Sequence, residues 1–297
     1  MERRHLEIFL AVVDHGGFTK AAEALYMAQP SLSQTVRTLE RELGCSLFTR
    51  GPRGTAPTAA GRALVEPARS ILRGFTVAGE SVRAVLGLEG GRLDIAAPAG
   101  LTFEVLASQV GRLRSEHPLI ECVITEVQDD TQVVQLLTES AAELAFLYLT
   151  DYSVVGQTPG IEVRPLGLQQ MWLVAPPGSD LPETVPYGLL QDLPLVMPMD
   201  LGPGAALMMA QARSNGLAPR PMVTVESPGA LAPMVLAGAG CTLLARHSAQ
   251  SAAALGAEIR QFEPGLELKY GVALRTTPLS PAAAMFLDYV TGFSARD

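Results

Sequence analysis

The sequence lacks the long apolar segments that mark membrane and secreted proteins. No run approaches the roughly 18 residues that a membrane-spanning helix needs. The first residues, MERRHLEIF, contain no apolar core of a signal peptide. We therefore expect a cytoplasmic protein without a membrane partner.

Cysteine is scarce as well. Cys45, Cys122 and Cys241 are the three cysteines of the chain, and they are far apart in the sequence. An odd number of isolated cysteines predicts neither a disulfide framework nor a zinc site. Isolated cysteines are usually inert core residues, and a redox-sensing pair of Cys122 and Cys241 is the alternative.

Catalytic and cofactor-binding motifs are also missing. The chain contains no G-x-S-x-G, H-E-x-x-H or P-loop sequence. Its G-x-G segments at 202–204 and 238–240 lack the third glycine of a dinucleotide fingerprint. His5 and His15 have no metal-binding partner at helical spacing. We therefore expect a protein that is not an enzyme and that holds no metal or cofactor.

Positive charge is limited and unevenly distributed. The chain has 22 Lys+Arg against 30 Asp+Glu, for a net charge of -8. Up to Leu88, however, 11 basic residues stand against 8 acidic ones, whereas the remainder has 11 basic and 22 acidic residues. The N-terminal excess is consistent with DNA binding, and the acidic remainder discourages DNA from binding elsewhere. Because the excess is small, tight binding is expected to need a dimer or a tetramer.

The N-terminal part does contain two short helical patterns joined by a polar turn, over residues 18–43. Thr19 is placed to cap the first helix, and Pro30 suits the first turn of the second. One side of the second helix is apolar and carries Leu32, Val36, Leu39 and Leu43. The other side is polar and carries Ser31, Ser33, Gln34, Arg37 and Arg41. Such a helix suits the major groove of DNA, where polar side chains meet base edges and cationic ones meet phosphates.

Two further patterns follow the helix pair. Residues 46–55 predict two short extended segments around a Gly/Pro turn with Arg50 and Arg53, the layout of a wing. Arg53 either enters a minor groove or touches phosphate from a plain basic loop. From residue 58 to about 86, apolar residues recur at alternating spacings of four and three, which is typical of lengthwise packing against a partner helix. They are Leu64, Ala68, Ile71, Phe75, Ala78, Val82 and Val85.

Beyond the glycines at 87, 90 and 91, strand-like segments alternate with helical ones. The first set covers 93–97, 101–116, 120–127, 131–139 and 144–149. The second set begins near Ile161 and includes 171–175, 194–197, 204–215, 222–225, 229–237 and 241–244. The last segments, 270–275 and 281–292, look like a return to the first set. This alternation predicts an α/β fold with βαβ units and a mostly parallel sheet.

The N-terminal segments resemble the winged helix-turn-helix of LysR-type transcriptional regulators. The resemblance runs from Leu6 to Gly61 and rests on GGFTKAAEAL, QPSLSQTVRTLERELG, LFTR and PTAAG, in this order. It extends more weakly through HPLIECVITEV, WLVAPPGSDL and AGAGCTLLAR.

The resemblance implies three parts. Residues 1–60 would form a winged helix-turn-helix DNA-binding domain, and residues 58–88 the linker helix through which such proteins dimerise. Residues 90–297 would form an effector-binding regulatory domain with the bilobed α/β shape of periplasmic binding proteins. Its subdomain I would cover about 90–160 and 267–297, and its subdomain II about 161–266.

The resemblance also implies which residues bind DNA, with positions 29–37 as the contacting face. The side chains expected to read bases are those of Gln29, Ser31, Ser33 and Gln34, beside Pro30. Those expected to hold phosphates or the groove are Thr19, Arg37, Arg50 and Arg53. Those expected to join two chains are Leu64, Ala68, Ile71, Phe75 and Val82.

A cleft between two such lobes binds ligands at the carboxyl ends of strands, near helix N-termini. The candidate effector-binding residues are Pro98, Ala99, Gly100, Thr102, Gln128, Asp129, Met199, Asp200 and Glu226. Family members often have a run of hydroxyl residues after the first strand, whereas here Thr102 is the only hydroxyl nearby.

The candidate strand ends carry acids and no arginine or lysine. Asp129, Asp130, Asp200 and Glu226 stand there. We therefore expect a neutral, amine-bearing or largely apolar effector rather than a small anion. The alternative is that these acids only cap helices and are solvated, and that no small molecule is sensed.

These features favour a sequence-specific DNA-binding transcriptional regulator controlled by an effector in the cleft. Its partners would be double-stranded DNA, a small-molecule effector and further copies of itself in a homodimer or homotetramer, with RNA polymerase as a candidate. The alternative is a cytoplasmic small-molecule-binding module whose N-terminal domain mediates protein–protein contact. Salt separates the two, because DNA binding weakens by orders of magnitude as salt rises.

Overall fold

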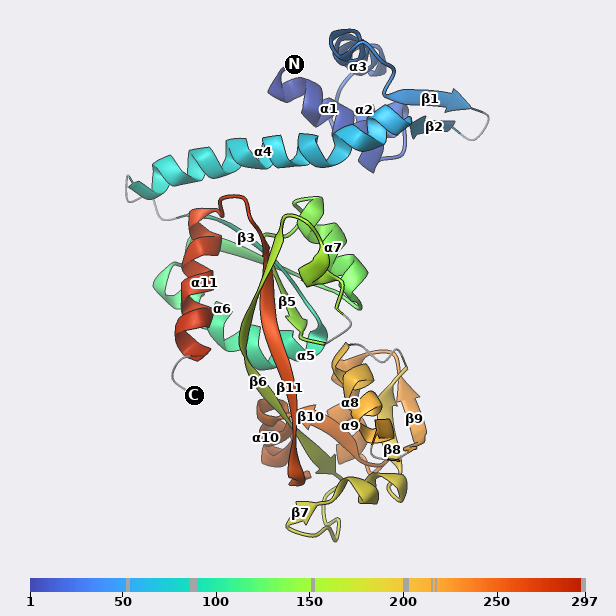
Figure 1. Ribbon diagram of the computed structural model, residues 1–297, viewed down its shortest axis with the longest axis vertical. Helices are drawn as coiled ribbons and strands as arrows, with labels where there is room; N and C mark the ends of the chain where they lie inside the picture. Colours follow the sequence, from blue (N-terminus) through green and yellow to red (C-terminus); the bar gives the residue numbers. More distant parts are fainter. Residues whose placement is uncertain are drawn as a thin grey trace. The chain divides into compact units, whose positions relative to one another are not determined.

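The computed structural model describes residues 1–51, 54–85, 90–150, 153–199, 203–214, 216 and 218–294. The chain forms two compact units, one of residues 1–88 together with 138–141 and one of the remaining residues (Figure 1). Helices and strands alternate through the larger unit, so the predicted α/β class is confirmed.

The first unit begins with three helices around a small apolar core. They are α1 (Arg3–Asp14), α2 (Phe18–Ala24) and α3 (Gln29–Leu43). Leu6 and Phe9 pack with Leu39 in one cluster. Ile8 packs with Leu32 in a second cluster that also includes the alanines of α2. Both clusters bury α1, so the helix-turn-helix pair rests on the first helix.

The sequence predicts only some of the ends of these helices correctly. Gly44 ends α3 as predicted, because its φ of 69° is left-handed and lets the chain leave the helix. The prediction that Thr19 caps α2 is wrong. The helix already starts at Phe18, its N-cap residue is Gly17, and no side chain caps it.

A hairpin and a long helix complete the first unit. Strands β1 (Phe48–Gly51) and β2 (Gly54–Pro57) pair antiparallel in the predicted wing, and helix α4 (Ala59–Val85) follows. The hydroxyl of Thr58 accepts the N–H of Gly61 at 3.0 Å and so caps α4. A Cβ at Gly61 would lie 2.1 Å from the carbonyl oxygen of Leu47, so this position requires glycine.

The second unit is built on one sheet with the strand order β10-β6-β11-β5-β3-β4, and β7 pairs with β11. The pairs β4–β3 and β3–β5 are parallel, whereas β5–β11, β11–β6 and β6–β10 are antiparallel. The strands are β3 (Gly91–Ala97), β4 (Ile120–Glu126), β5 (Leu144–Tyr148), β6 (Ile161–Ala175), β7 (Thr184–Val185), β10 (Thr242–Ala245) and β11 (Glu258–Arg275).

Two lobes share this sheet (Figure 1). Lobe I holds β3, β4 and β5 with α5 (Ala99–Leu101), the π-helical turn η1 (Thr102–Leu106), α6 (Ala107–Glu116), α7 (Asp130–Thr138), η2 (Val155–Gln157) and α11 (Pro281–Ser294). Lobe II holds β7, β10 and the parallel pair β8 (Leu195–Pro198) and β9 (Pro221–Val225), with η3 (Tyr187–Gln191), α8 (Pro203–Ser214), η4 (Pro228–Ala230), α9 (Leu231–Leu236) and α10 (Arg246–Ala254). Strands β6 and β11 run from one lobe to the other.

These two strands correct the sequence-based picture. Only 171–175 and 270–275 were predicted as strands, and the sheet was expected to be mostly parallel. Instead β6 and β11 pair antiparallel from Ile161 and Arg275 to Ala175 and Glu258. Pro165 and Gly167 weaken the strand signal in the first half of β6, because both residue types are depleted in strands. Helix α10 was missed altogether.

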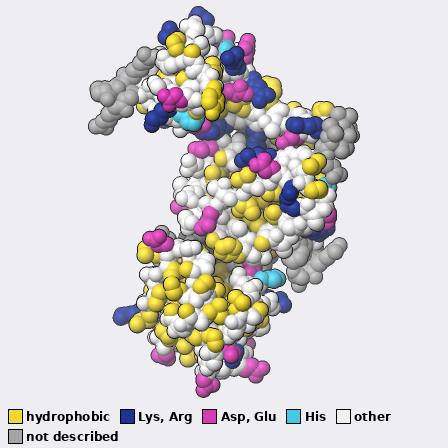
Figure 2. Space-filling model, turned by 180° about the vertical axis from the view of Figure 1, so that it is seen from behind, with side chains coloured by type: hydrophobic (Ala, Val, Ile, Leu, Met, Phe, Trp, Pro, Cys, Tyr) yellow, Lys and Arg dark blue, Asp and Glu magenta, His cyan; other side chains and the backbone are white. Residues whose placement is uncertain are grey.

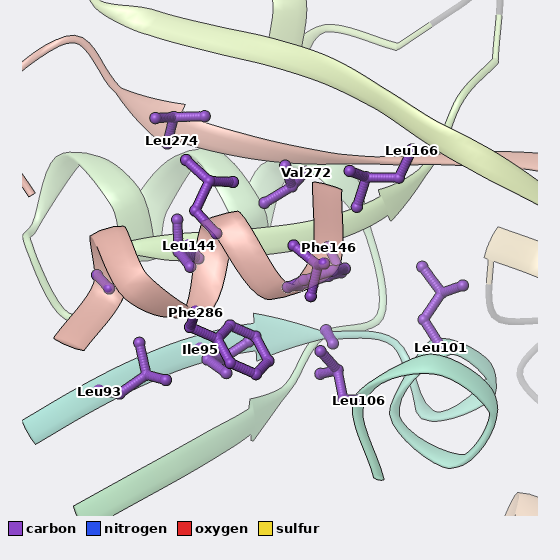
Figure 3. Packing of buried hydrophobic residues seen from close by; sticks show 14 of the residues in the cluster. Leu93, Ile95, Leu101, Leu106, Leu144, Phe146, Leu166, Val272, Leu274 and Phe286 are labelled. Carbon is purple, nitrogen blue, oxygen red and sulfur yellow. The ribbon is translucent and has the colours of Figure 1, made fainter. Parts of the chain in front are cut away.

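The core of lobe I lies between the sheet and helix α11 (Figure 3). Phe286 of α11 meets Phe146 of β5 edge to face, with the ring centroids 6.3 Å apart and the planes at 70°. A buried carboxylate fixes the start of α11. Glu143 accepts the N–H of Ser280 at 2.9 Å and its hydroxyl at 2.6 Å, so the residue before α11 is anchored to lobe I.

Candidate DNA-binding surface and ligand cavity

The outer face of α3 presents the side chains that were predicted to contact DNA. Gln29, Ser31, Gln34 and Arg37 are exposed there, and so is Pro30 at the start of the helix. On the apolar side, Leu32, Val36 and Leu39 are buried in the core, whereas Leu43 at the end of the helix is 41% exposed. Figure 2 shows Lys and Arg side chains at several points on the surface of this unit. The helix is therefore amphipathic, with its polar side free.

Ser33 departs from the predicted face. Its side chain is buried, with the residue 2% exposed, and its hydroxyl accepts the amide N–H of Gln29 at 3.0 Å. The prediction that Ser33 stands on the open polar side is wrong, because the position falls on the packed side of the helix. The bond holds the Gln29 amide, so Ser33 positions a neighbouring polar group.

The carboxylates of α3 are turned toward the unit itself. Glu40 accepts the backbone N–H of Leu47 at 2.7 Å, and Glu42 lies 3.6 Å from Nδ1 of His5. Among the described residues, neither Arg37 nor Arg41 forms an ion pair. The Arg41 guanidinium donates to the Thr38 hydroxyl at 3.4 Å, and neither arginine has a carboxylate partner among the described residues. Both can therefore bind an external anion, and a guanidinium matches phosphate geometry well.

The structure describes the other residues that were predicted to contact DNA only in part. Thr19 is exposed near the start of α2. Arg50 pairs with Thr55 in the hairpin, but its side chain lies outside the described residues, as does the whole of Arg53.

The apolar residues that recur along α4 at heptad spacing form a seam, and this seam divides into a buried and an exposed part. Ala68 is fully buried in the unit's own core, and Leu64 packs against the same cluster. The prediction that Ala68 contacts a second chain is therefore corrected, whereas Leu64 is only partly buried and its predicted role stays a prediction. Ile71, Phe75 and Val82 are 40%, 50% and 62% exposed and continue the seam into solvent. Arg3 lies over the ring of Phe75 at 5.7 Å.

In the second unit, a cavity of about 320 Å³ lies between the lobes, at the carboxyl ends of their strands. Residues that follow β3, together with the ends of β4 and β5 and the segment after β4, form the wall on lobe I. Residues from β8, β10 and the segment after β9 form the wall on lobe II, and Gln169 and Met171 of β6 lie between them. This is the position expected for a ligand in an open α/β sheet.

Five of the nine predicted effector-binding residues line this cavity, namely Pro98, Ala99, Gly100, Gln128 and Glu226. Thr102, Asp129 and Met199 do not, and Asp200 lies outside the described residues. The Thr102 hydroxyl donates to the carbonyl of Pro98 at 3.3 Å. Asp129 accepts the N–H of Gln132 at 2.9 Å and so caps α7, which is the capping role considered for these acids.

The floor of the cavity is a buried polar chain. Tyr148 donates its hydroxyl to Oε1 of Gln169 at 2.7 Å, and Nε2 of Gln169 donates to the carbonyl of Gly100 at 3.3 Å. A Cβ at Gly100 would lie 2.5 Å from the Tyr148 hydroxyl, so a glycine makes room for it. Burial raises the pKa of the Tyr148 phenol far above its usual value, and the phenol therefore stays protonated.

Sequence reasoning missed much of the lining. Tyr148 was not among the predicted cavity residues. Every residue of β5 is buried, so its sequence does not indicate which side chains face a ligand. Gln169 was missed because the part of β6 before Met171 was not predicted as a strand, and Met171 was predicted in a strand but not as a cavity residue. Their two-residue spacing puts them on one face of a strand, and this signal becomes readable once the strand is known.

Cys122 and Cys241 show no sign of activation, and Cys45 is exposed rather than part of a core. Cys122 packs against the main cluster of lobe I, and Cys241 belongs to a cluster of lobe II. Burial raises the pKa of both thiols, which makes them poorer nucleophiles. Within the described residues, no group of three or more His, Cys, Asp and Glu is arranged to hold a metal ion. No described helix is both long and apolar enough to cross a membrane.

The chain combines a winged helix-turn-helix, in which α3 has an exposed polar side, with a two-lobed unit that contains a cavity. This architecture is that of a class of bacterial DNA-binding regulators. Residues 3–62 match the model of the bacterial regulatory helix-turn-helix proteins of the lysR family. Residues 86–294 match the LysR substrate binding domain. The chain belongs to the LysR family of transcriptional regulators.

One relative of similar length supports this assignment, and two solved structures share the fold. The nitrogen assimilation regulatory protein nac of Klebsiella aerogenes is 31% identical over 301 residues, covering 100% of this chain and 96% of that protein. Full-length CbnR complexed with its target DNA has a TM-score of 0.66 at 22% identity, covering 99% of this chain and 100% of that chain. A full-length OxyR variant from Pseudomonas aeruginosa has a TM-score of 0.72 at 20% identity, covering 100% and 95%. The predicted bilobed regulator fold is confirmed.

Proposed function

We propose that this LysR-type regulator binds double-stranded DNA by placing the outer face of α3 in the major groove. The observation that carries the proposal is the composition of that face. Gln29, Ser31 and Gln34 are exposed near the start of the helix, and Arg37 and Arg41 follow without an ion-pair partner among the described residues. Amides and hydroxyls suit base edges, and guanidinium groups suit phosphates.

The two kinds of side chain have different roles in this proposal. Gln29 and Gln34 would read bases, because an amide can donate and accept at the same adenine. Arg37 would hold phosphate, so its contribution would be the same for every sequence. Thr19, Arg50 and Arg53 would add backbone or groove contacts, as the sequence predicts.

A homodimer or homotetramer would present two or more heads to one DNA site. Ile71, Phe75 and Val82 support this, because they form an exposed apolar seam along α4 with heptad spacing. Linking two heads raises the affinity for paired half-sites without any new contact between one head and DNA.

The cavity between the lobes would hold a small-molecule effector. Its binding would favour one arrangement of the lobes over another and so change how the heads meet DNA. In this proposal the chain is a regulator and not an enzyme, and RNA polymerase is the partner on which the DNA-bound form acts.

Fluorescence anisotropy with the DNA upstream of the chain's own gene, across a salt series, tests the proposal. Arg37→Ala is expected to weaken binding to all sequences and to reduce the slope of log affinity against log salt by about one. Gln34→Ala is expected to relax the preference at one base pair by about 1–3 kcal/mol. Arg220→Ala removes an exposed arginine from the second unit and is the matched control.

The outcomes separate the alternatives. Specific binding that survives Gln34→Ala unchanged would move base reading to the wing or to DNA shape. DNA binding that does not change with salt would contradict the proposed surface. So would an equal loss of DNA binding in Arg220→Ala and Arg37→Ala. A chain that binds no DNA at any salt would favour the module in which the N-terminal domain contacts another protein.

A further inference from the structure

We infer that the cavity between the lobes takes an organic cation, namely a protonated amine on a small, largely apolar body. The inference rests on the proposed function, in which this cavity holds the effector, and it names the chemical class of that effector.

The charged groups on the cavity wall all have the same sign. Glu126, at the end of β4, and Glu226, after β9, line the cavity from opposite lobes. None of the described residues that line it is an arginine, a lysine or a histidine. An anionic ligand would therefore find no side-chain counter-ion in the wall, whereas an ammonium group would find one on either side.

One of these carboxylates is held in place. Nε2 of Gln128, a lining residue, donates to Oε1 of Glu126 at 3.0 Å. This bond orients the carboxylate and leaves its second oxygen without a hydrogen bond from a described residue. Glu126 and Gln128 are both exposed, so this bond favours one orientation of the carboxylate without burying it. A carboxylate with a preferred orientation binds an ammonium group with less loss of side-chain entropy than one without.

A third carboxylate acts on Tyr148 without lining the cavity. Glu104 has a side chain only 8% exposed, accepts the backbone N–H of His247 at 2.8 Å and lies 2.8 Å from Nδ1 of the same histidine. Burial is the main cause of the raised pKa of Tyr148, and the negative charge of Glu104 adds to it. The same field that disfavours a phenolate at the floor would disfavour a ligand carboxylate there.

The floor itself presents acceptor atoms. Tyr148 is 5% exposed and Gln169 3% exposed, and both line the cavity. The single hydroxyl hydrogen of Tyr148 goes to Gln169, so the phenol oxygen keeps its lone pairs. An ammonium or amine N–H can donate to that oxygen. A carboxylate would place its own lone pairs against it.

The rest of the wall is apolar. Phe103, Met171, Met197, Leu231 and Leu243 come from both lobes and from β6. Such side chains match a ring or an aliphatic chain, and Phe103 can also meet a cation with its ring face. Ligand cavities of roughly 300–1,000 Å³ hold small molecules, so the volume of about 320 Å³ points to a compact ligand.

Calorimetric titration of the full chain with matched triplets of probes tests the inference. Each triplet carries one apolar body with an ammonium, a hydroxyl or a carboxylate, for example 2-phenylethylamine, 2-phenylethanol and phenylacetate, with 3-phenylpropyl, hexyl and naphthylethyl bodies beside it. The amine is expected to bind tightest for the body that fits. Glu126→Gln and Glu226→Gln are each expected to weaken that amine by roughly fivefold and to leave the alcohol unchanged.

Two control variants keep the result specific. Glu121→Gln removes an exposed carboxylate of the same strand that does not line the cavity, and it is expected to leave all probes unchanged. Tyr148→Phe is expected to weaken amine and alcohol alike, because it removes the floor acceptor. If Tyr148→Phe does not fold, Glu126→Gln and Glu226→Gln still test whether the cavity prefers a positively charged ligand.

The inference is overturned if a carboxylate binds as tightly as its matched amine, or if no amine in the set binds. It is also overturned if the amine preference survives both Glu126→Gln and Glu226→Gln. DNA binding is measured by anisotropy on the same samples. Salt-dependent DNA binding that persists in any of these cases leaves the proposed regulator intact and removes only the ligand class.

Discussion

Oε1 of Glu104 in lobe I lies 2.8 Å from the backbone nitrogen of His247 at the start of α10 in lobe II. Its Oε2 also accepts the N–H of Ser248 at 3.4 Å. The first N–H groups of a helix have no partner within the helix. A carboxylate of one lobe therefore caps a helix of the other, close to the cavity that both lobes line.

Glu104→Ala is expected to lower the free energy of unfolding by about 1–2 kcal/mol, because it removes this cap and leaves N–H groups unpaired. Urea unfolding of the full chain, followed by circular dichroism, measures the change. Glu121→Ala removes a carboxylate that is 67% exposed and is expected to stay within about 0.5 kcal/mol of the parent. Equal losses in the two variants would mean that Glu104 does not act as a cap.

Gly61→Ala and Gly74→Ala are expected to change stability in opposite directions, although both glycines lie in α4. A Cβ at Gly61 would meet the Leu47 carbonyl oxygen at 2.1 Å, so Gly61→Ala should cost about 2–4 kcal/mol or prevent folding. A Cβ at Gly74 meets nothing within 4 Å, so Gly74→Ala should stabilise by about 0.5–1 kcal/mol. Thermal melts compare them, and a stabilising Gly61→Ala would contradict the close approach.

Tyr26→Gly is expected to stabilise the first unit by about 0.5–1 kcal/mol. Tyr26 has a φ of 52°, in the left-handed region that costs side-chain-bearing residues about 1–2 kcal/mol, and it is 98% exposed, so little packing is lost. Leu255→Gly is the control, because Leu255 is 73% exposed but has a φ of -97°. Only Tyr26→Gly should raise the urea midpoint.

Tyr148 gives the chain a stability term that disappears at high pH. Its pKa is raised by burial, so the native state keeps a phenol proton that the unfolded chain loses above its ordinary pKa of about 10. This contribution to the free energy of unfolding is fully present below that pH, and it is lost as the pH rises toward the pKa of the folded state. Tyr148→Phe should therefore show a shallower fall in urea stability above about pH 10 than the parent. Tyr26→Phe, at an exposed ring, should match the parent.

Phe75→Glu is expected to reduce the assembly to smaller species in analytical ultracentrifugation. Phe75 lies in the middle of the exposed seam of α4, and a charge there cannot be buried between two helices without a partner. Ala63→Glu adds the same charge at another exposed position of α4 and should leave the assembly unchanged. An unchanged assembly in Phe75→Glu would remove α4 from the interface.

Much of the first unit could be predicted from the sequence, because its helices depend mainly on interactions between residues that are close in the chain. The apolar spacing of Leu32, Val36 and Leu39 fixes which side of α3 is buried. Gly44 ends that helix through its own backbone freedom. Ser33 could not be placed this way, because it lies at the edge of the apolar side and its burial depends on neighbouring helices.

The cavity was less predictable because its parts come from distant stretches of chain. Tyr148 and Gln169 meet only because β5 and β6 both pair with β11, and such pairing is not written in the local pattern. Ala68 was misassigned for a related reason. Its heptad spacing is real, but the first unit's own α1 packs against the face that a second chain was expected to cover.

Strands β6 and β11 make lobe II an insertion within lobe I. The chain enters along β6 and returns along β11, and Glu258 pairs with Ala175, so both ends of the inserted segment are neighbours in the sheet. Neither lobe can unravel without breaking the ladder that runs into the other. Heat should therefore melt the two lobes together in one cooperative transition, and a cut in the chain within lobe II should weaken lobe I as well.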